Sequence, residues 1–279
     1  MIIKKTFSLM LLIFFLSSLF IFANLNCKKD DSNPVETKDP TDTIPAPAGW
    51  KLVWNDEFYG TSIDKTKWEH EVNGDGGGNN ELQYYTDSQA NSYVQNGLLV
   101  IQAKKENYQG KQYTSARMRT KYKGDWKYGR FEIKARLPYG QGMWPAIWLL
   151  PTDWEYGGWP ESGEIDIMEL LGHQTDKVYG TIHWGTSQNH QSSGGNYTLK
   201  TGTFAGLYHV FALEWDSTGF KWFVDDIQYY TAKHGQPFDK RFHMILNVAV
   251  GGNWPGNPDE STSFPQKMYV DYVRVFEKK

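Results

Sequence analysis

The sequence predicts an all-β domain, a two-sheet β-sandwich of the jelly-roll type, over residues 49–279. Apolar and polar residues alternate with a period of two in one segment after another of this range. The stretches between these segments are rich in Gly, Asn and Pro, which favour tight turns. No long amphipathic helix is evident. Many short strands without helices are typical of sandwiches and barrels, and a chain of this length suits a jelly roll.

The strands are predicted from their alternation, which residues 129–137 show most clearly. Phe131 and Ile133 stand between charged residues there, so one face of this strand should be buried and the other should face water. Asp225-Asp226 lies between two such segments, which predicts a tight hairpin. Sheets of this kind often curve, and the hollow of a curved sheet is a natural groove for a long polymer. The predicted strands are 98–103, 129–137, 178–184, 209–215, 220–224, 227–230, 244–250 and 268–276.

The first residues indicate a signal for export. Lys4 and Lys5 precede an almost wholly apolar run, 6–23, which is the pattern of a secretory signal. The single cysteine, Cys27, follows this run closely, as in a bacterial lipoprotein signal, which this segment resembles. We therefore expect residues 1–26 to be removed and Cys27 to be lipidated. An uncleaved anchor helix and an ordinary secretory signal remain as alternatives.

Residues 27–48 are predicted to form a disordered tether. This segment is rich in Pro and Asp and contains no aromatic residue, so it has nothing to pack against a core. A lipid anchor at Cys27 would place the folded domain in the cell envelope, on the outer membrane or the cell surface. Without lipidation the protein would be secreted.

Composition excludes several classes of protein. Lys plus Arg number 29 and Asp plus Glu number 32, a balance that does not suit nucleic acid, and we expect a monomer. One cysteine excludes a disulfide framework and a multi-cysteine zinc site. The twelve tryptophans exceed what a core usually accommodates, because each indole N–H needs a partner. Sequence patterns of a serine-hydrolase elbow, a zinc-protease helix and a dinucleotide-binding loop are absent.

Three acidic residues interrupt a segment that otherwise has the outline of a buried strand. Alternation puts Glu164 and Asp166 on one face and their isoleucine neighbours on the other. Glu169 has the wrong parity for the acidic face. One extra residue, a β-bulge at about Ile167-Met168, would return it to that face, and bulges are frequent beside active sites. The pattern therefore favours a functional site.

Spacing and electrostatics relate these acids to glycoside hydrolysis. With the bulge, the backbones of Glu164 and Glu169 are ~13 Å apart, so the carboxyl groups can approach to roughly 5–7 Å. Retaining glycosidases require ~5–5.5 Å and inverting ones ~6.5–9.5 Å, so the spacing favours retention. Two carboxylates at that distance repel by about 3 kcal/mol at an effective dielectric near 20, so the pair tends to share one proton. A calcium site and a solvated strand face are the other interpretations.

The flanking segments identify a family. Together with the acidic core Glu164-Ile-Asp-Ile-Met-Glu169, they resemble glycoside hydrolase family 16, and within it the laminarinase-like β-glucanases. The resemblance extends over residues 50–276. The segments that carry it are 54–58 (WNDEF), 126–132 (WKYGRFE), 142–151 (GMWPAIWLLP), 180–185 (GTIHWG) and 247–255 (NVAVGGNWP).

This resemblance implies a concanavalin A-like jelly roll with a curved substrate groove. It also implies a retaining endo-hydrolase of β-1,3-linked or mixed 1,3/1,4-linked glucan, such as laminarin, with no cofactor for catalysis. Matched by position, Glu164 would be the nucleophile, Glu169 the general acid/base, and Asp166 the residue that keeps their ionisations apart. A hydrolase of agar or carrageenan and a non-catalytic glucan-binding lectin on the same fold are the alternatives.

Aromatic and polar residues near these motifs are candidates for binding the sugar chain. The C–H faces of a sugar ring stack on flat aromatic rings, and its hydroxyls need polar partners. Each candidate also has a structural interpretation, as sandwich core for a tryptophan, as a structural histidine, or as a turn for the asparagine. The candidates are Trp144, Trp148, Trp159, His183, Asn80, Trp126 and Trp254.

A structural calcium ion is the remaining implication of the resemblance. Asp271 is an acid in a terminal strand that is otherwise largely apolar. Family members often hold one calcium away from the groove with such an Asp and backbone carbonyls, which here would come from Glu57 and Gly97. A salt bridge of Asp271 is the simpler alternative.

Overall fold

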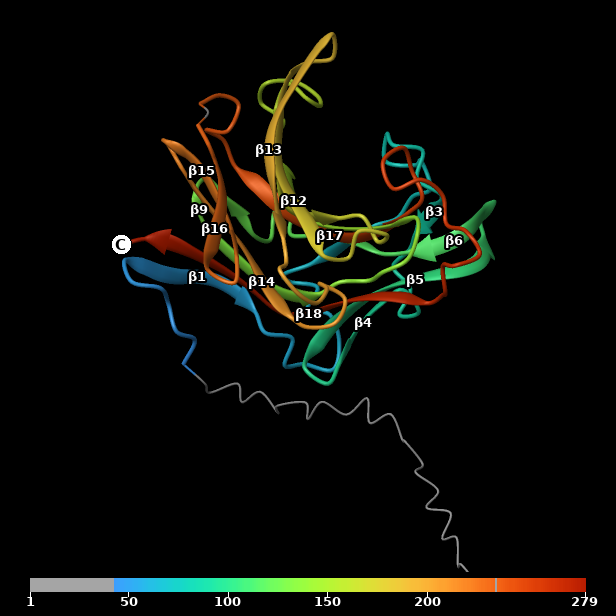
Figure 1. The fold of residues 1–279 in the computed structure, drawn as a ribbon. Coiled ribbons are helices and arrows are strands. Elements are labelled where there is room, and N and C mark those ends of the chain that lie inside the picture. The colour runs from blue at the N-terminus through green and yellow to red at the C-terminus, as the bar shows by residue number, and fades with distance from the viewer. Residues whose placement is uncertain (1–42, 234) are drawn as a thin grey trace, which may run out of the picture. The chain divides into compact units, whose positions relative to one another are not determined.

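The structure, a computed structural model, describes residues 43–233 and 235–279 (Figure 1). The predicted signal at 1–26, the lipidation site Cys27 and most of the tether lie outside the described residues. Strand β1 (Trp50–Asp56) is the first regular element, close to the predicted start of the domain. No helix in the described part of the chain has the length and apolar character needed to cross a membrane.

Two β-sheets form the domain, which confirms the predicted sandwich (Figure 1). The ten-stranded sheet has the order β16-β15-β14-β9-β18-β5-β6-β3, with β1 also paired to β18 and β4 to β5. Its strands after β1 are β3 (Gln83–Tyr85), β4 (Ser92–Gln95), β5 (Leu98–Tyr108), β6 (Lys111–Ser115), β9 (Gly129–Arg136), β14 (His209–Asp216), β15 (Gly219–Val224), β16 (Ile227–Ala232) and β18 (Gln266–Lys278).

The eight-stranded sheet has the order β13-β12-β11-β10-β17-β7-β2, with β8 paired to β17. Every pairing within it is antiparallel. The acidic strand β11 therefore lies inside this sheet, between β10 and β12. The strands are β2 (Glu69–Glu71), β7 (Arg117–Arg119), β8 (Asp125–Trp126), β10 (Met143–Pro151), β11 (Glu164–Leu170), β12 (Lys177–Thr186), β13 (Asn189–Thr198) and β17 (Phe242–Val250).

All eight predicted strands are present, and the predicted hairpin joins β15 to β16. Asp225 and Asp226 have φ angles of 48° and 65°, the left-handed conformation that two-residue hairpin turns require. Strand β13 was not predicted, because its sequence is polar throughout and has no apolar alternation. It is an edge strand of exposed and half-buried residues, of which Tyr197 packs against the core.

The polar face of β9 differs from the prediction that it would face water. Arg130 and Glu132 are only 6% and 9% exposed. The guanidinium of Arg130 is 2.6 Å from the Glu132 carboxylate and 2.9 Å from that of Glu214, so the charges compensate one another. Burial of such a cluster is tolerated because each charge has a partner of opposite sign.

Large aromatic side chains fill the space between the two sheets. Trp68, Trp215 and Trp222 are almost fully buried. Each of their indole N–H groups has an acceptor: Asp56 Oδ2 at 2.8 Å, the Phe238 carbonyl at 3.1 Å and the Asp166 carbonyl at 2.8 Å. The last of these bonds joins the core directly to the acidic strand β11.

Candidate active site

A β-bulge in β11 places the three acids on the same face of the sheet. Toward β10, Met168 pairs with Ile147 and Asp166 pairs with Trp148, so Ile167 is an extra residue. The register toward β12 shifts at the same place, between Asp166 and Glu169. Ile167 and Met168 are both buried in the core, and Glu169 returns to the face of Asp166. The predicted bulge is confirmed.

The acids line a cleft of about 650 Å³ on the face of this sheet that points away from the core. Strands β2, β7, β10, β11, β12 and β17 contribute to its lining, together with the glycine-rich loop before β3. The cleft therefore extends across the strands, and Glu164, Asp166 and Glu169 all open into it. This is the groove that the predicted curved sheet implied.

The three acids have different polar neighbours. The indole Nε1 of Trp144 donates to Glu169 Oε1 at 2.9 Å. Asp166 is 2% exposed, and its Oδ2 lies 3.2 Å from His183 Nε2. Glu164 pairs directly with His183 across β11 and β12. Each acid thus has a distinct local environment, although all three share one face.

Burial and mutual repulsion raise the pKa of every acid in the cluster. Burial raises the pKa of Glu169 to about 8, the negative charge of Asp166 adds to this, and the hydrogen bond from Trp144 opposes it. Burial likewise raises the pKa of Asp166 to about 8. The pKa of Glu164 is well above its usual value, first from burial and then from the charge of Asp166. The three carboxyl groups therefore retain protons as a group at neutral pH.

The chemistry of the donor set does not favour calcium at the acids. Within the described residues, Glu164, Asp166 and His183 present ligand atoms that lie within 4.8 Å of one another. Calcium prefers six to eight oxygen ligands, and one of these three donors is an imidazole nitrogen. The alternative of a calcium site at the acids is therefore disfavoured.

Most of the predicted aromatic residues line the cleft. Trp144, Trp148, Trp159 and Trp254 are all in its lining, and so is His183. Trp159 and Trp254 are 49% and 41% exposed, so their ring faces are open to a ligand. Trp144 packs edge-on against Trp254 with ring centroids 5.6 Å apart, beside the carboxyl group that Trp144 contacts.

Two of the predicted binding residues lie elsewhere. Trp126 was predicted to bind sugar, but it packs edge-on against Trp54 and Phe131, with centroids 5.4 and 5.6 Å away, and belongs to the core side of the sheet. Asn80 is exposed at the rim and donates to Asn253 Oδ1 at 2.9 Å. The residues on either side of Asn80 line the cleft, and Asn80 itself does not.

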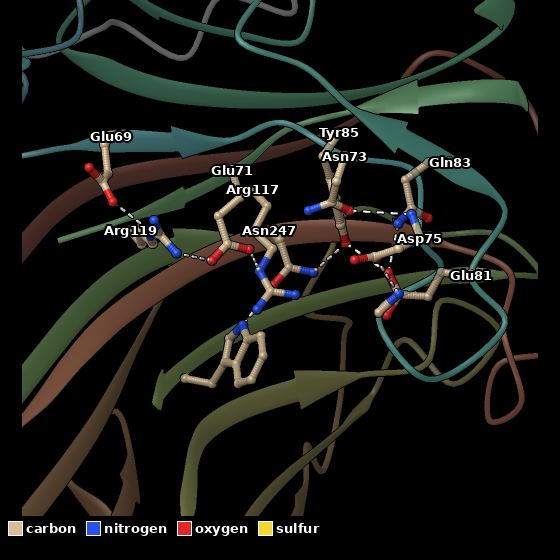
Figure 2. Close-up of polar contacts among 12 residues, drawn as sticks. Glu69, Glu71, Asn73, Asp75, Glu81, Gln83, Tyr85, Arg117, Arg119 and Asn247 are labelled. Atoms are coloured by element: carbon tan, nitrogen blue, oxygen red, sulfur yellow. Dashed lines mark hydrogen bonds and ion pairs between the residues drawn. The ribbon is translucent and has the colours of Figure 1, made fainter. Parts of the chain in front are cut away.

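A chain of hydrogen bonds that the sequence did not predict leads from Trp148 to a buried carboxylate (Figure 2). Trp148 Nε1 donates to Asn247 Oδ1 at 2.7 Å, and Asn247 Nδ2 donates to the Tyr85 hydroxyl at 3.0 Å. Tyr85 then donates to Glu81 Oε2 at 3.0 Å, and Gln83 donates to the same oxygen at 2.6 Å. One signal was available in the sequence: Asn247 is a polar residue inside an apolar strand.

Arginines enter the cleft on the same side, and acids neutralise them (Figure 2). The guanidinium of Arg117 lies 4.6 Å from the centroid of the Trp148 ring, and its Nε is 2.7 Å from Glu71 Oε2. Arg119 pairs with both Glu69 and Glu71. Arg117 therefore covers one face of the Trp148 ring, and the pairs together carry no excess charge.

The residues predicted to hold calcium come from three segments: Asp271 is on β18, Glu57 follows β1, and Gly97 lies between β4 and β5. Asp56 pairs with Val273, and Leu99 pairs with Val270. Glu57, which follows Asp56, and Gly97, two residues before Leu99, therefore lie near Asp271. The Asp271 carboxylate is 3.0 Å from Lys134 Nζ, which is the salt bridge of the alternative interpretation. The Glu57 carboxylate binds Arg274 through both oxygens. A structural calcium ion stays a prediction.

A cleft across a β-sandwich, with paired carboxyl groups and tryptophans, defines a polysaccharide-acting glycoside hydrolase. The model of the glycosyl hydrolases family 16 matches residues 78–274, and the chain belongs to this family. Its predicted membership and jelly-roll fold are thereby confirmed.

Relatives and solved structures agree with this assignment. The chain is 45% identical to a beta-glucanase of Rhodothermus marinus over 243 residues, 81% of this chain and 85% of that protein. It is 42% identical to glucan endo-1,3-beta-glucosidase A1 of Niallia circulans over 278 residues, 89% of this chain and 40% of that protein. The laminarinase catalytic domain of Thermotoga maritima superposes with a TM-score of 0.77 at 43% identity, covering 82% of this chain and 99% of that one.

The raised pKa of Glu169 predicts that its charge destabilises the fold at alkaline pH. Between its usual pKa of 4.5 and about 8, the unfolded chain has released a proton that the folded chain retains, so stability falls as pH rises through this window. Glu169→Gln cannot ionise and can still accept the Trp144 hydrogen bond. At pH 8 this variant should melt about 2–4 °C above the wild type, as ~1 kcal/mol implies for a domain of this size.

Thermal melts followed by circular dichroism at pH 5 and pH 8 measure this difference. The gain in melting temperature should be much smaller at pH 5, where the wild-type carboxyl is protonated in the folded state. A gain that is equal at both pH values, or a wild type that is more stable at pH 8, would contradict the proposed protonation of Glu169.

Proposed function

We propose that this protein is an endo-acting glycoside hydrolase that cleaves β-1,3-linked or mixed 1,3/1,4-linked glucan, such as laminarin, with retention of configuration. The observation that carries the proposal is the bulged strand β11, which presents Glu164, Asp166 and Glu169 together to a cleft lined by tryptophans. The names of the relatives, a beta-glucanase and a glucan endo-1,3-beta-glucosidase, support the choice of substrate.

The reaction proceeds in two displacements. Glu164 attacks the anomeric carbon, while Glu169 gives its proton to the glycosidic oxygen of the departing chain. A covalent glycosyl ester on Glu164 results. Glu169, now a carboxylate, takes a proton from a water molecule that attacks the same carbon, and the ester bond to Glu164 breaks. Both acids return to their starting states, and the configuration is retained.

The environment of each acid supports its role. Trp144 donates to Glu169 Oε1, which is compatible with a proton carried on Oε2 of that carboxyl group. An ionised Asp166 raises the pKa of Glu169 and so favours the protonated acid. His183 lowers the pKa of Glu164 against the effect of burial, which favours the ionised nucleophile. The three carboxyl groups can share their protons in several ways, and the reactive arrangement places a proton on Glu169.

A neutral glucan suits the cleft better than a sulfated galactan does. Carrageenan would require cations that are free to pair with sulfate groups. Arg117 and Arg119 are the arginines on the β7 side of the cleft, and Glu71 and Glu69 already pair with them. Tryptophans and uncharged hydrogen-bonding groups, which suit glucose rings, remain for substrate.

A lectin on the same fold would not require the acidic cluster to bind sugar. Burying three carboxyl groups beside one another costs stability unless each is compensated, and the basic side chain in contact with Asp166 is the imidazole of His183. A binding module would gain from neutral residues at these positions. Retention of all three acids supports catalysis.

Glu164→Ala and Glu169→Ala should each abolish hydrolysis of laminarin. Losing the nucleophile removes the first displacement, and losing the acid removes leaving-group protonation, so we expect kcat to fall by about 10²–10⁴-fold or more. With an aryl glucoside whose leaving group needs little protonation, Glu169→Ala should keep far more activity than Glu164→Ala. Reducing-sugar release on laminarin, mixed-linkage glucan, agarose and carrageenan measures both the effect and the substrate class.

Glu277→Ala provides the matched control, because it removes an exposed glutamate outside the cleft lining. This variant should retain wild-type turnover. Near-normal turnover by either cleft variant would refute the catalytic assignment. Faster cleavage of agarose or carrageenan than of laminarin would refute the substrate assignment.

We propose further that the protein is exported and anchored in the cell envelope by lipid on Cys27. The apolar run that precedes this cysteine and the proline-rich segment that follows it support this localisation. Cys27→Ala should move the protein from the membrane fraction to the soluble fraction, as immunoblots of fractionated cells would measure. Unchanged membrane retention of the variant would contradict lipidation.

A further inference from the structure

The hairpin of β12 and β13 brings a second histidine to the acidic cluster. This hairpin projects from the sandwich (Figure 1), and β13 forms the edge of the eight-stranded sheet. His190 lies on β13 and, like His183 of β12, lines the cleft. His190 has no place in the two-displacement reaction described above.

The two imidazole rings contact each other and the acid between the catalytic glutamates. His183 Nδ1 and His190 Nε2 are 3.0 Å apart, and the ring planes differ by only 14°. The other nitrogen of His183, Nε2, lies 3.2 Å from Asp166 Oδ2. His190, His183 and Asp166 therefore form a continuous row of polar contacts from the hairpin to the centre of the site.

We infer that His190 is a positioning residue, which holds the His183 ring so that its Nε2–H faces Asp166. This inference rests on the proposed hydrolase function and adds a residue to it. His190 touches neither the glutamates nor the reacting bond. It acts through His183, as an outer partner that fixes the orientation of an imidazole commonly does.

Hydrogen-bond chemistry explains why His183 needs this partner. A carboxylate has only lone pairs to offer, so the His183 nitrogen that approaches Asp166, Nε2, must carry a proton. In neutral His183 the Nδ1 atom is then an acceptor, and His190 Nε2–H is the donor that meets it. If His183 is cationic, its Nδ1–H donates to His190 in the other tautomer. In both states His190 satisfies Nδ1 and prevents the ring from rotating away from Asp166.

Asp166 depends on this arrangement because it is buried. Within the described residues its Oδ2 makes no hydrogen bond, and the basic atom beside it is His183 Nε2, 3.2 Å away, which the ring must keep in this place. The titratable groups of β11 that also interact with His183 are Glu164 and Glu169, and Glu161 accepts a hydrogen bond from Ser187 N of the hairpin at 3.1 Å. All three are acids, so none of them supplies a positive charge beside Asp166.

Loss of the row would change the ionisation of the catalytic glutamates. Without His183 Nε2–H beside it, the buried Asp166 carboxylate would take up a proton more readily. Its negative charge contributes to the raised pKa of Glu169, so the general acid would then lose its proton at lower pH. The same charge raises the pKa of Glu164, so both limbs of the pH profile of activity should move to lower pH.

Two variants at one position separate the hydrogen bond from the ring. His190 also packs against Trp159, with centroids 5.0 Å apart. His190→Phe keeps an aromatic ring against Trp159 and His183 but provides no hydrogen bond. His190→Gln loses the ring but can place an amide N–H where His190 Nε2 lies. Steady-state kinetics on laminarin from pH 4 to 9 and ¹H–¹⁵N NMR of the His183 ring are measured for both.

His190→Phe should lower kcat by about tenfold or more, with KM little changed, and shift the pH profile of activity to lower pH. Its NMR spectrum should show His183 losing the uniform Nε2–H tautomer. His190→Gln should stay within about threefold of the wild type and keep that tautomer. Melting curves of both variants establish that the domain is folded.

A His190→Phe variant with the wild-type pH profile and an Nε2–H tautomer of His183 would overturn the inference. Equal losses in both variants, seen mainly in KM, would also overturn it and assign His190 to sugar stacking. The NMR measurement does not depend on turnover. If the wild type cleaves no glucan, the proposed function fails, while the tautomer of His183 still tests the role of His190.

Discussion

The site depends on a single irregularity of the backbone, the β-bulge at Ile167-Met168. In a regular strand Glu169 would point into the core, where the apolar residues of both sheets leave no room for a carboxyl group. At the bulge two successive residues, Ile167 and Met168, are buried in the core, and the next residue, Glu169, faces the cleft. Because β11 lies between β10 and β12, both neighbouring strands fix the bulge in place, and the sheet holds the backbone of the acids rigidly.

Raised pKa values in the cluster are the physical consequence of this placement. Carboxyl groups that share one face of a buried strand must repel one another, and the fold offers them few cations. Their polar contacts come from different parts of the chain: Trp144 of β10 donates to Glu169, and His183 of β12 lies beside Asp166. Trp222 of the opposite sheet donates to the backbone carbonyl of Asp166. The stability lost by burying these acids is what makes a protonated acid available beside an ionised one at neutral pH.

Local pattern was enough to predict eight of the strands, the hairpin and the bulge in the acidic strand, because each depends on the alternation of neighbouring residues. Contacts between distant segments could not be predicted in this way. Trp126 and Trp148 have the same residue type and similar apolar surroundings in the sequence, yet one packs in the core and the other lines the cleft. The chain from Trp148 through Asn247 to Glu81 and the pairing of His183 with His190 both join segments whose register only the folded sheet defines.

The central claim is that Glu164 and Glu169 face each other at the separation that a covalent sugar intermediate requires, roughly 5–5.5 Å between carboxyl groups. The stereochemistry of the first product tests this most directly. Laminari-oligosaccharide hydrolysis followed by time-resolved ¹H NMR should show the new reducing ends first as the β anomer, with the α anomer appearing later by mutarotation. Initial appearance of the α anomer would mean that water attacks directly, and the account of the site would be wrong.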